Sequence, residues 1–318
     1  RAKMKIAFFS SDAISIKPLE FLRDTHELVC VVSNPDKPKG RGNRLSPNDV
    51  AQWALDNSIE LLRPAGKPDA AVVERMRELG AELALFMAYG HLLKDNILNF
   101  GKYPCLNLHA SALPELRGAS PIETAIALGK RETGVSLMKI SREMDAGDVA
   151  DIERVSIDDC DSSKTLREKI SAASVEILRR DLPLLERGEL AFSAQDKTLA
   201  TYSRKLCKDD ARLDFRHSAR TLLNRIRAFG FGILHYQNDQ IKVFDARICE
   251  ELKSFPRAGE ILEASSDGLK IACSEGAVVF ASLQKPCAKA MGARDFFAGY
   301  KMQKGAIVES SDNAPLLR

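Results

Sequence analysis

The 318-residue chain lacks any hydrophobic run that approaches the length of a membrane-spanning helix. Such a helix needs about 20 consecutive apolar residues, so we expect no membrane attachment, and no signal-peptide pattern opens the chain. The seven cysteines are scattered, and none has Cys-x-x-Cys spacing. This pattern favours reduced thiols in a cytoplasmic protein over a disulfide framework or a zinc site.

Charge of one sign is not in large excess, because 47 Lys and Arg face 44 Asp and Glu. The distribution is uneven, however. From Thr201 to the end, 19 basic residues face 14 acidic ones, whereas the first 200 residues carry 28 and 30. A basic C-terminal part suits a polyanionic partner, although ordinary scatter of charge on a solvated surface explains the count equally well.

Short apolar runs alternate with helical periodicity in the first half of the chain. This alternation predicts an α/β fold with a Rossmann-like, mainly parallel sheet. The predicted buried strands are Lys5–Ser10, Leu28–Ser33, Glu82–Met87 and Cys105–His109. The predicted helices are Ile16–Arg23, Asn48–Asp56 and Pro68–Leu79, with Pro68 in a first turn and Gly80 as the stop.

Glycine is missing from the segment that follows the first predicted strand, which reads Ser10-Ser11-Asp12-Ala13. A dinucleotide-binding loop needs glycines at this point, because the backbone must approach the pyrophosphate closely. The sequence therefore disfavours a nicotinamide or flavin enzyme.

The second half of the chain changes character after a long amphipathic helix pattern at Ser162–Glu186. We place a first domain at residues 4–187, a polar linker at 188–203, a second domain at 204–308 and a tail at 309–318. One basic helix, Ser218–Arg227, precedes several short β-like runs, which together predict an OB-like β-barrel. The predicted strands are Gln240–Phe244, Glu260–Leu262, Leu269–Cys273 and Ala277–Leu283.

Three polar residues are candidates for chemistry. Asn107 and His109 end a predicted buried strand, where ligands meet open α/β sheets, and Asp145 lies in a turn-rich stretch that could return to them. An amide, an imidazole and a carboxylate suit acyl transfer through an oxyanion. Taken singly, each residue also has a structural explanation, such as a cap, a packed histidine or a turn. We expect no metal, because asparagine is a poor transition-metal ligand and no second histidine lies nearby.

The motifs Asn107-x-His109, the loop from Ser111 to Ile122, and Asp145-x-Gly147-Asp148 resemble those of the formyltransferases that use 10-formyltetrahydrofolate. The resemblance implies catalytic roles for Asn107, His109 and Asp145, with 10-formyltetrahydrofolate as co-substrate. Folate contacts are expected at Ser111, Ala112, Leu113 and Pro114, with Tyr89 and Gly90 as a further pocket wall. Tyr89 suits packing equally well.

Two basic segments, residues 34–45 and 201–206, look like those of the methionyl-tRNA formyltransferases within this family. The resemblance implies formyl transfer to the free amino group of methionyl-initiator tRNA in translation initiation, by a monomeric cytoplasmic enzyme. Alternatively, these residues form an ordinary solvated, charged surface without a binding role. The candidate tRNA contacts are Lys37, Lys39, Arg41, Arg44, Arg204, Lys205 and Arg225.

Other functions remain open at this point. Within the family, the acceptor could be a nucleotide sugar or water, but the basic segments favour tRNA. An RNA-binding protein without catalytic activity could also have this scaffold, but the intact polar trio counts against it.

Overall fold

The structure is a computed structural model that describes residues 3–39, 44–91, 95–98, 100–249 and 256–318. It divides into two compact units. The N-terminal unit comprises residues up to 121, 132–156 and 165–203, and the C-terminal unit comprises 122–131, 157–164 and 204–318. Two short stretches of the first half of the chain, residues 122–131 and 157–164, thus belong to the C-terminal unit. We still propose a first domain at residues 4–187 and a second at 204–308.

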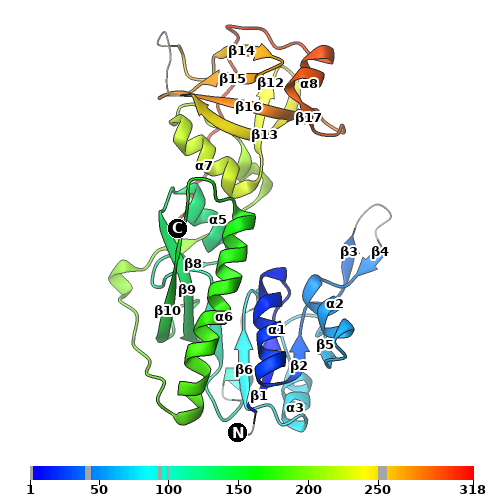
Figure 1. The fold of residues 1–318 in the computed structure, drawn as a ribbon, viewed down its shortest axis with the longest axis vertical. Coiled ribbons are helices and arrows are strands. Elements are labelled where there is room, and N and C mark those ends of the chain that lie inside the picture. Colours follow the sequence, from blue (N-terminus) through cyan, green and yellow to red (C-terminus); the bar gives the residue numbers. More distant parts are fainter. Residues whose placement is uncertain (1–2, 40–43, 92–94, 99, 250–255) are drawn as a thin grey trace. The chain divides into compact units, whose positions relative to one another are not determined.

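A seven-stranded sheet forms the centre of the N-terminal unit, in the order β10-β9-β7-β6-β1-β2-β5 (Figure 1). β5, β2, β1, β6 and β7 pair in parallel, whereas β9 runs antiparallel to β7 and to β10. The strands are β1 (Lys5–Phe9), β2 (Glu27–Val32), β5 (Leu61–Leu62), β6 (Leu83–Phe86), β7 (Leu106–His109), β9 (Glu132–Lys139) and β10 (Val149–Ser156). The predicted mainly parallel sheet is confirmed, and the four predicted strands agree to within one residue at each end.

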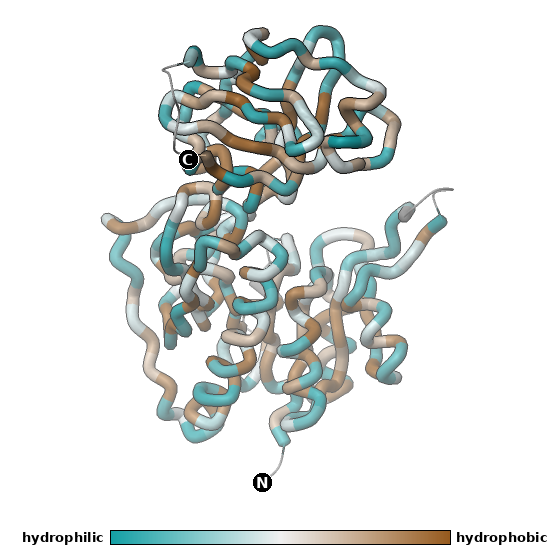
Figure 2. Tube along the Cα trace, turned by 45° about the horizontal axis from the view of Figure 1, so that its top comes forward, coloured by the Kyte–Doolittle hydropathy of each residue, from teal (hydrophilic) through white to brown (hydrophobic). Residues whose placement is uncertain are grey.

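Helices cover both faces of this sheet. Ala7 and Phe9 of β1 pack with Val73 and Met76 of α3 in one apolar cluster, so the alternate residues of β1 face the other side. On a tube coloured by hydropathy, the most apolar stretches lie inside each unit (Figure 2). The helices are α1 (Ile16–Thr25), α2 (Asp49–Asp56), α3 (Ala70–Glu78), α4 (Asp95–Leu98), α5 (Pro121–Ala127, mostly in the C-terminal unit) and α6 (Ser163–Arg187), with short turns η1 (Ala13–Ser15) and η2 (Lys197–Leu199).

Helix ends follow local capping chemistry. Asp69 caps α3, because its carboxylate accepts hydrogen bonds from the backbone N–H of Ala71 and Val72. The predicted place of Pro68 in the first turn is therefore wrong, since Pro68 precedes the cap. The predicted stop at Gly80 is confirmed, and its φ of +72° is a left-handed conformation that glycine adopts without strain.

The basic segment after β2 is a hairpin. β3 (Lys37–Lys39) pairs antiparallel with β4 (Arg44–Ser46), and residues 40–43 at its tip lie outside the described residues. Elsewhere in the N-terminal unit, β8 (Arg117–Gly118) pairs in parallel with β11 (Tyr202–Ser203).

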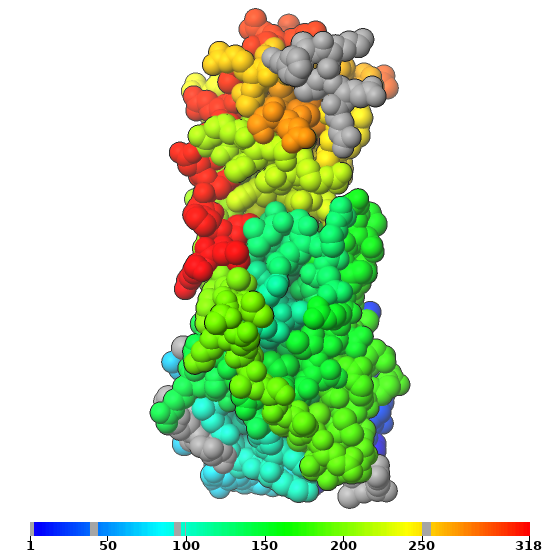
Figure 3. Space-filling model, turned by 90° about the vertical axis from the view of Figure 1, so that its left-hand side faces the viewer, coloured from blue at the N-terminus to red at the C-terminus, as the bar shows by residue number. Residues whose placement is uncertain are grey.

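Residues 188–203, which we name the strap, follow α6 and run back along β10 (Figures 1 and 3). Val149 and Ser193 form an isolated antiparallel bridge, with two backbone hydrogen bonds of 2.9 Å. The segment that we predict as a linker is therefore attached to the N-terminal unit.

The C-terminal unit is built on an antiparallel sheet in the order β12-β13-β16-β15-β14, with β17 beside β16. One further segment joins its two edges, because Glu309 bridges to His235 of β12 and Ile307 bridges to Glu260 beside β14. This closure fits the predicted OB-like barrel. The elements are η3 (Lys208–Ala211), α7 (Ala219–Phe229), β12 (Gly232–Tyr236), β13 (Asp239–Cys249), β14 (Ile261–Ser265), β15 (Gly268–Ala272), β16 (Ala277–Gln284), β17 (Met291–Gly292) and α8 (Ala293–Gly299).

Two kinds of feature are absent from the described residues. No helix among them is both long and apolar enough to cross a membrane. Likewise, no group of three or more His, Cys, Asp or Glu side chains is placed to hold a metal ion in that part of the chain.

Asp181 of α6 is buried, and its Oδ2 atom has no hydrogen-bond partner in the described structure. Burial and the negative charge of Asp151 raise the pKa of Asp181 to about 6, from an ordinary value of about 3.9. Between these two values the native state holds a proton that the unfolded chain has lost. Stability therefore falls as the pH rises through this window, and the loss is complete above it.

We expect Asp181→Asn to raise the free energy of unfolding by about 2 kcal/mol at pH 8, with almost no effect near pH 4. Urea unfolding at the two pH values measures this difference. Glu176→Gln, an exposed change on the same helix, serves as the control and should be neutral at both. An Asp181→Asn effect that does not vary with pH would contradict the assignment.

Candidate active site

β7 carries the first two candidate residues. Asn107 and His109 are two positions apart on a strand, so their side chains leave the same face of the sheet. β6 flanks Asn107 through its register partner Phe86, and β9 flanks His109 through Ser136. His109 is 7% exposed. Asn107 is half-buried, and its amide makes no hydrogen bond to any described residue.

The imidazole of His109 is held from both sides. Its Nε2 lies 3.0 Å from the carbonyl oxygen of Leu116. A carbonyl oxygen only accepts, so Nε2 carries a proton in this arrangement. The other ring nitrogen, Nδ1, lies 3.7 Å from Oδ2 of Asp145. Nδ1 is thus the ring nitrogen left to exchange a proton, and a carboxylate stands beside it.

Asp145 reaches His109 because its loop folds back. β9 is antiparallel to β7, and Ile140 donates to the carbonyl oxygen of Cys105, so the loop between β9 and β10 starts beside the first residue of β7. At Asp145 the backbone has a φ of +50°. Its Oδ2 accepts a 2.8 Å hydrogen bond from the backbone N–H of Gly118.

Gly147 in the same loop has a steric role. A Cβ at Gly147 would lie 1.9 Å from the carbonyl oxygen of Lys139, which is far inside contact distance. Any side chain there would push the loop away from β9. The glycine of the Asp-x-Gly-Asp motif is therefore required by packing.

Sequence reasoning missed two residues beneath this loop. Arg117 is 1% exposed, and its Nε and Nη2 donate to Oε1 of Gln195 at 3.0 and 2.8 Å. Its Nη1 donates to the hydroxyl of Tyr202 at 2.8 Å. The only sequence signal was the position of Arg117 inside the loop that resembles the family motif.

The loop predicted to contact folate is rigidly attached to β9. Ser136 Oγ donates to the carbonyl oxygen of Ser111 at 2.7 Å and accepts from the backbone N–H of Leu113 at 3.0 Å. Ser111 Oγ donates to the carbonyl oxygen of Glu115. The loop includes Ala112 and a cis Leu113–Pro114 peptide bond, and it directly follows His109.

Tyr89 and Gly90 follow β6 on the same sheet edge. The Tyr89 ring packs at 5.4 Å from Phe9 and at 6.2 Å from Phe86, and burial raises the pKa of Tyr89 to about 12. Its hydroxyl is buried without a hydrogen-bond partner in the described structure. The ring therefore packs in the core, with an unused polar atom at its end, and Gly90 continues in a left-handed conformation at φ +81°.

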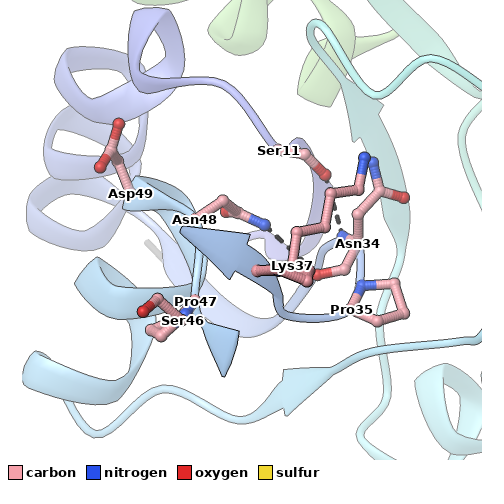
Figure 4. Close-up of a pocket in the computed structure, with 9 residues that line it drawn as sticks. Ser11, Asn34, Pro35, Lys37, Ser46, Pro47, Asn48 and Asp49 are labelled. Carbon is pink, nitrogen blue, oxygen red and sulfur yellow. Dashed lines mark hydrogen bonds between the residues drawn. The ribbon is translucent and has the colours of Figure 1, made fainter. Parts of the chain in front are cut away.

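A cavity of about 330 Å³ lies at the carboxyl ends of β1 and β2. The side chains of Ser11 and Asn48 are turned toward the backbone of Asn34 there, with Lys37 of the hairpin alongside (Figure 4). Ser11 Oγ accepts from the backbone N–H of Asn34 at 2.9 Å, and Nδ2 of Asn48 donates to the Asn34 carbonyl oxygen at 3.3 Å. This cavity has both polar and proline side chains in its lining and shares its sheet edge with Asn107, as expected for a ligand site in an open α/β sheet.

Comparison with known families identifies this combination of units. The family described as "Formyl transferase" matches residues 4–182, and "Formyl transferase, C-terminal domain" matches residues 205–301. The chain belongs to the formyl transferase family. It is 34% identical over 313 residues to a protein named methionyl-tRNA formyltransferase from a Sulfurihydrogenibium species, covering 96% of this chain and 100% of the relative.

Other formyl transferases agree with this assignment. A protein of the same name from Hydrogenovibrio crunogenus is 33% identical, covering 92% of this chain and 95% of its own length. Among solved structures, an N-formyltransferase from Helicobacter canadensis, described in complex with folinic acid and dTDP-3-aminofucose, has a TM-score of 0.66. It is 17% identical and covers 90% of this chain and 100% of its own, so it supports the fold alone.

The candidate tRNA contacts of this formyl transferase differ in exposure. Lys37 and Arg44 on the hairpin are exposed, as is Lys205. Lys39 ends β3, with Arg44 as its register partner, and Arg41 lies outside the described residues.

The remaining two candidates are less accessible, because Arg204 is half-buried and Arg225 is buried. Both terminal nitrogens of Arg204 bond to the carboxylate of Asp210, and its Nε donates to the Pro315 carbonyl oxygen. Arg225 is 7% exposed, and burial lowers its pKa. Arg204 therefore stabilises the C-terminal unit through Asp210, whereas Nη1 of Arg225 is buried without a hydrogen-bond partner in the described structure.

Arg204→Ala should lower the free energy of unfolding by about 3 kcal/mol at pH 7, because it removes the hydrogen-bonded ion-pair partner of the buried Asp210. Hydrogen bonds from Arg204 hold the pKa of Asp210 at about 2, below its usual range. The stabilisation is therefore present at neutral pH and is lost only as the pH falls toward that value.

Thermal or urea unfolding measures this effect. Lys205→Ala, its exposed neighbour, should change stability by less than about 0.5 kcal/mol. Unchanged stability of Arg204→Ala, together with weaker tRNA binding, would instead make Arg204 a tRNA contact.

Proposed function

We propose that this formyl transferase moves the formyl group of 10-formyltetrahydrofolate to the free amino group of methionyl-initiator tRNA. The observation that carries the proposal is the end-to-end similarity, at 34% identity, to a protein named for this activity. This similarity extends over both units. It therefore includes the C-terminal unit, which carries none of the three proposed catalytic residues. The site geometry is consistent with this chemistry.

In the proposed reaction, the amino nitrogen forms a bond to the formyl carbon and the bond from that carbon to the folate nitrogen breaks. Negative charge develops on the formyl oxygen, and Asn107 donates its unengaged amide N–H to that oxygen. One proton must leave the amine and one must reach the folate nitrogen. His109 Nδ1 and Asp145, 3.7 Å apart, are the groups placed to take the proton from the amine and to deliver one to the folate nitrogen.

The folate co-substrate would lie along the carboxyl edge of the sheet. The loop Ser111–Pro114 and the segment with Tyr89 and Gly90 flank β7 there, and the Tyr89 hydroxyl and Asn107 amide are unused polar groups. A flat pterin suits apolar walls with a few fixed polar groups.

The tRNA partner would meet the positive charge of basic side chains. We propose contacts from the hairpin through Lys37, Lys39, Arg41 and Arg44, and from Lys205 beside the strap. The hairpin borders the cavity at Ser11 and Asn34, so a tRNA end held by its cations would lie at the sheet edge that carries Asn107. Because initiator tRNA is used in the cytoplasm, we propose that location, and we propose a monomer.

Alanine at Asn107 should lower kcat by about 10²- to 10³-fold, through loss of an oxyanion donor. Alanine at His109 or Asp145 should cost about 10²- to 10⁴-fold, through loss of proton transfer. Formation of N-formylmethionyl-tRNA by the purified variants measures these losses, with thermal unfolding as the control for folding. A variant with a normal rate would remove its residue from the mechanism.

Wild-type enzyme should prefer methionyl-tRNA when water and an amino sugar nucleotide compete as acceptors. Formyl transfer mainly to the sugar or to water would reject the proposed acceptor.

The double variant Lys37→Ala, Arg44→Ala should raise KM for methionyl-tRNA and leave KM for the folate unchanged. The reason is that contacts to phosphate groups position the nucleic acid and not the folate. The slope of log affinity against log salt should decrease by about 1 for each phosphate that the variant no longer neutralises. Lys67→Ala, an exposed lysine outside the hairpin, should change neither quantity. An equal rise in both KM values would contradict a tRNA role.

A further inference from the structure

The strap supplies one side chain that reaches the loop carrying Asp145. Nε2 of Gln195 donates to the carbonyl oxygen of Asp145 at 2.9 Å and to that of Gly147 at 2.7 Å. Its Oε1 accepts both bonds from the buried Arg117. A single amide therefore joins a buried guanidinium group to the backbone on either side of Ala146.

The orientation of this amide is determined by its partners. Guanidinium only donates and carbonyl oxygens only accept, so the Gln195 oxygen must face Arg117 and the nitrogen must face the loop. Arg117 is itself held by the Tyr202 hydroxyl and lies 3.7 Å from Glu143. Arg117 of β8, together with Gln195 and Tyr202 of the strap, thus forms one continuous support under the loop.

The loop needs such a support because little regular structure holds it. Asp145 lies outside any strand, in a left-handed conformation at φ +50°. Its carboxylate must stay within reach of both Gly118 N–H and His109 Nδ1. A shift of about 1 Å in a catalytic group can cost about 10²-fold in rate.

We propose that Gln195 is a positioning residue that holds Asp145 against His109. It touches no reacting atom and acts through the backbone of the loop. The inference rests on the proposed function, since it assigns Gln195 a part in formyl transfer. It makes the strap a component of the catalytic unit.

Gln195→Glu separates positioning from simple structural support. Glutamate has nearly the same shape and still accepts the hydrogen bonds of Arg117, so the buried guanidinium stays paired. It cannot donate to the two carbonyl oxygens and would repel them. We expect kcat to fall about 10- to 100-fold, with KM for both substrates within about twofold and the melting temperature close to that of wild type.

Gln303→Glu is the matched control, because it makes the same chemical change at an exposed side chain in the C-terminal unit. It should leave kcat and both KM values unchanged. Gln195→Met, of similar volume and without hydrogen bonds, is a second variant should the glutamate variant not fold, and its kcat should fall similarly. Normal kcat in either folded Gln195 variant would overturn the proposal.

A crystal structure of Gln195→Glu tests the inference without any turnover assay. The separation of His109 Nδ1 and Asp145 Oδ2 should increase from 3.7 Å, and an unchanged separation would overturn the positioning role. Wild-type enzyme that makes no N-formylmethionyl-tRNA would reject the proposed function instead, so the two failures are distinguishable.

Discussion

The approach of the Asp145 carboxylate to His109 depends on hydrogen bonds to the backbone of one irregular loop. Gly118 N–H holds the carboxylate itself, and Gln195 holds the carbonyl oxygens on either side of Ala146. Both restraints come from parts of the chain far from the loop. Since β9 runs antiparallel to β7, the loop after β9 starts beside the first residue of β7, whereas His109 is the last. The loop must therefore turn back toward His109 and be fixed there. The proton transfer proposed for His109 and Asp145 follows from this return.

Burial separates the basic residues into two groups with different physical roles. The first group consists of Arg117, Arg204 and Arg225, whose side chains are largely enclosed by protein. Arg117 and Arg204 donate their hydrogen bonds to protein acceptors. Lys37, Arg44 and Lys205 remain exposed and can meet phosphate. Charge counts along the chain do not distinguish these groups, because a guanidinium that stabilises a loop and one that binds nucleic acid contribute equally to net charge.

The predictable part of the fold consists of elements with a strong local signal. β1, β2, β6 and β7 are continuous apolar runs bounded by polar residues, and they were predicted to within one residue. β10 was missed because seven of its eight residues are exposed or half-buried, so no apolar run marks it. β12 was also missed, because only Ile233 and Leu234 are adjacent apolar residues there before His235 interrupts the run. The hairpin β3–β4 is not among the predicted strands, since Pro38 and the cations argue against a strand.

Local sequence alone determined that Asn107 and His109 share a face, because residues two apart on a strand always do. The family motifs further pointed to Asp145, 36 positions beyond His109. Only the tertiary structure decided which His109 nitrogen faces Asp145, that Arg204 pairs with Asp210 while Arg225 is buried, and that Arg117 and Gln195 meet across 78 residues. Hydrogen bonds between such distant residues impose no spacing or periodicity on the chain, so nothing in the sequence marks them before it folds.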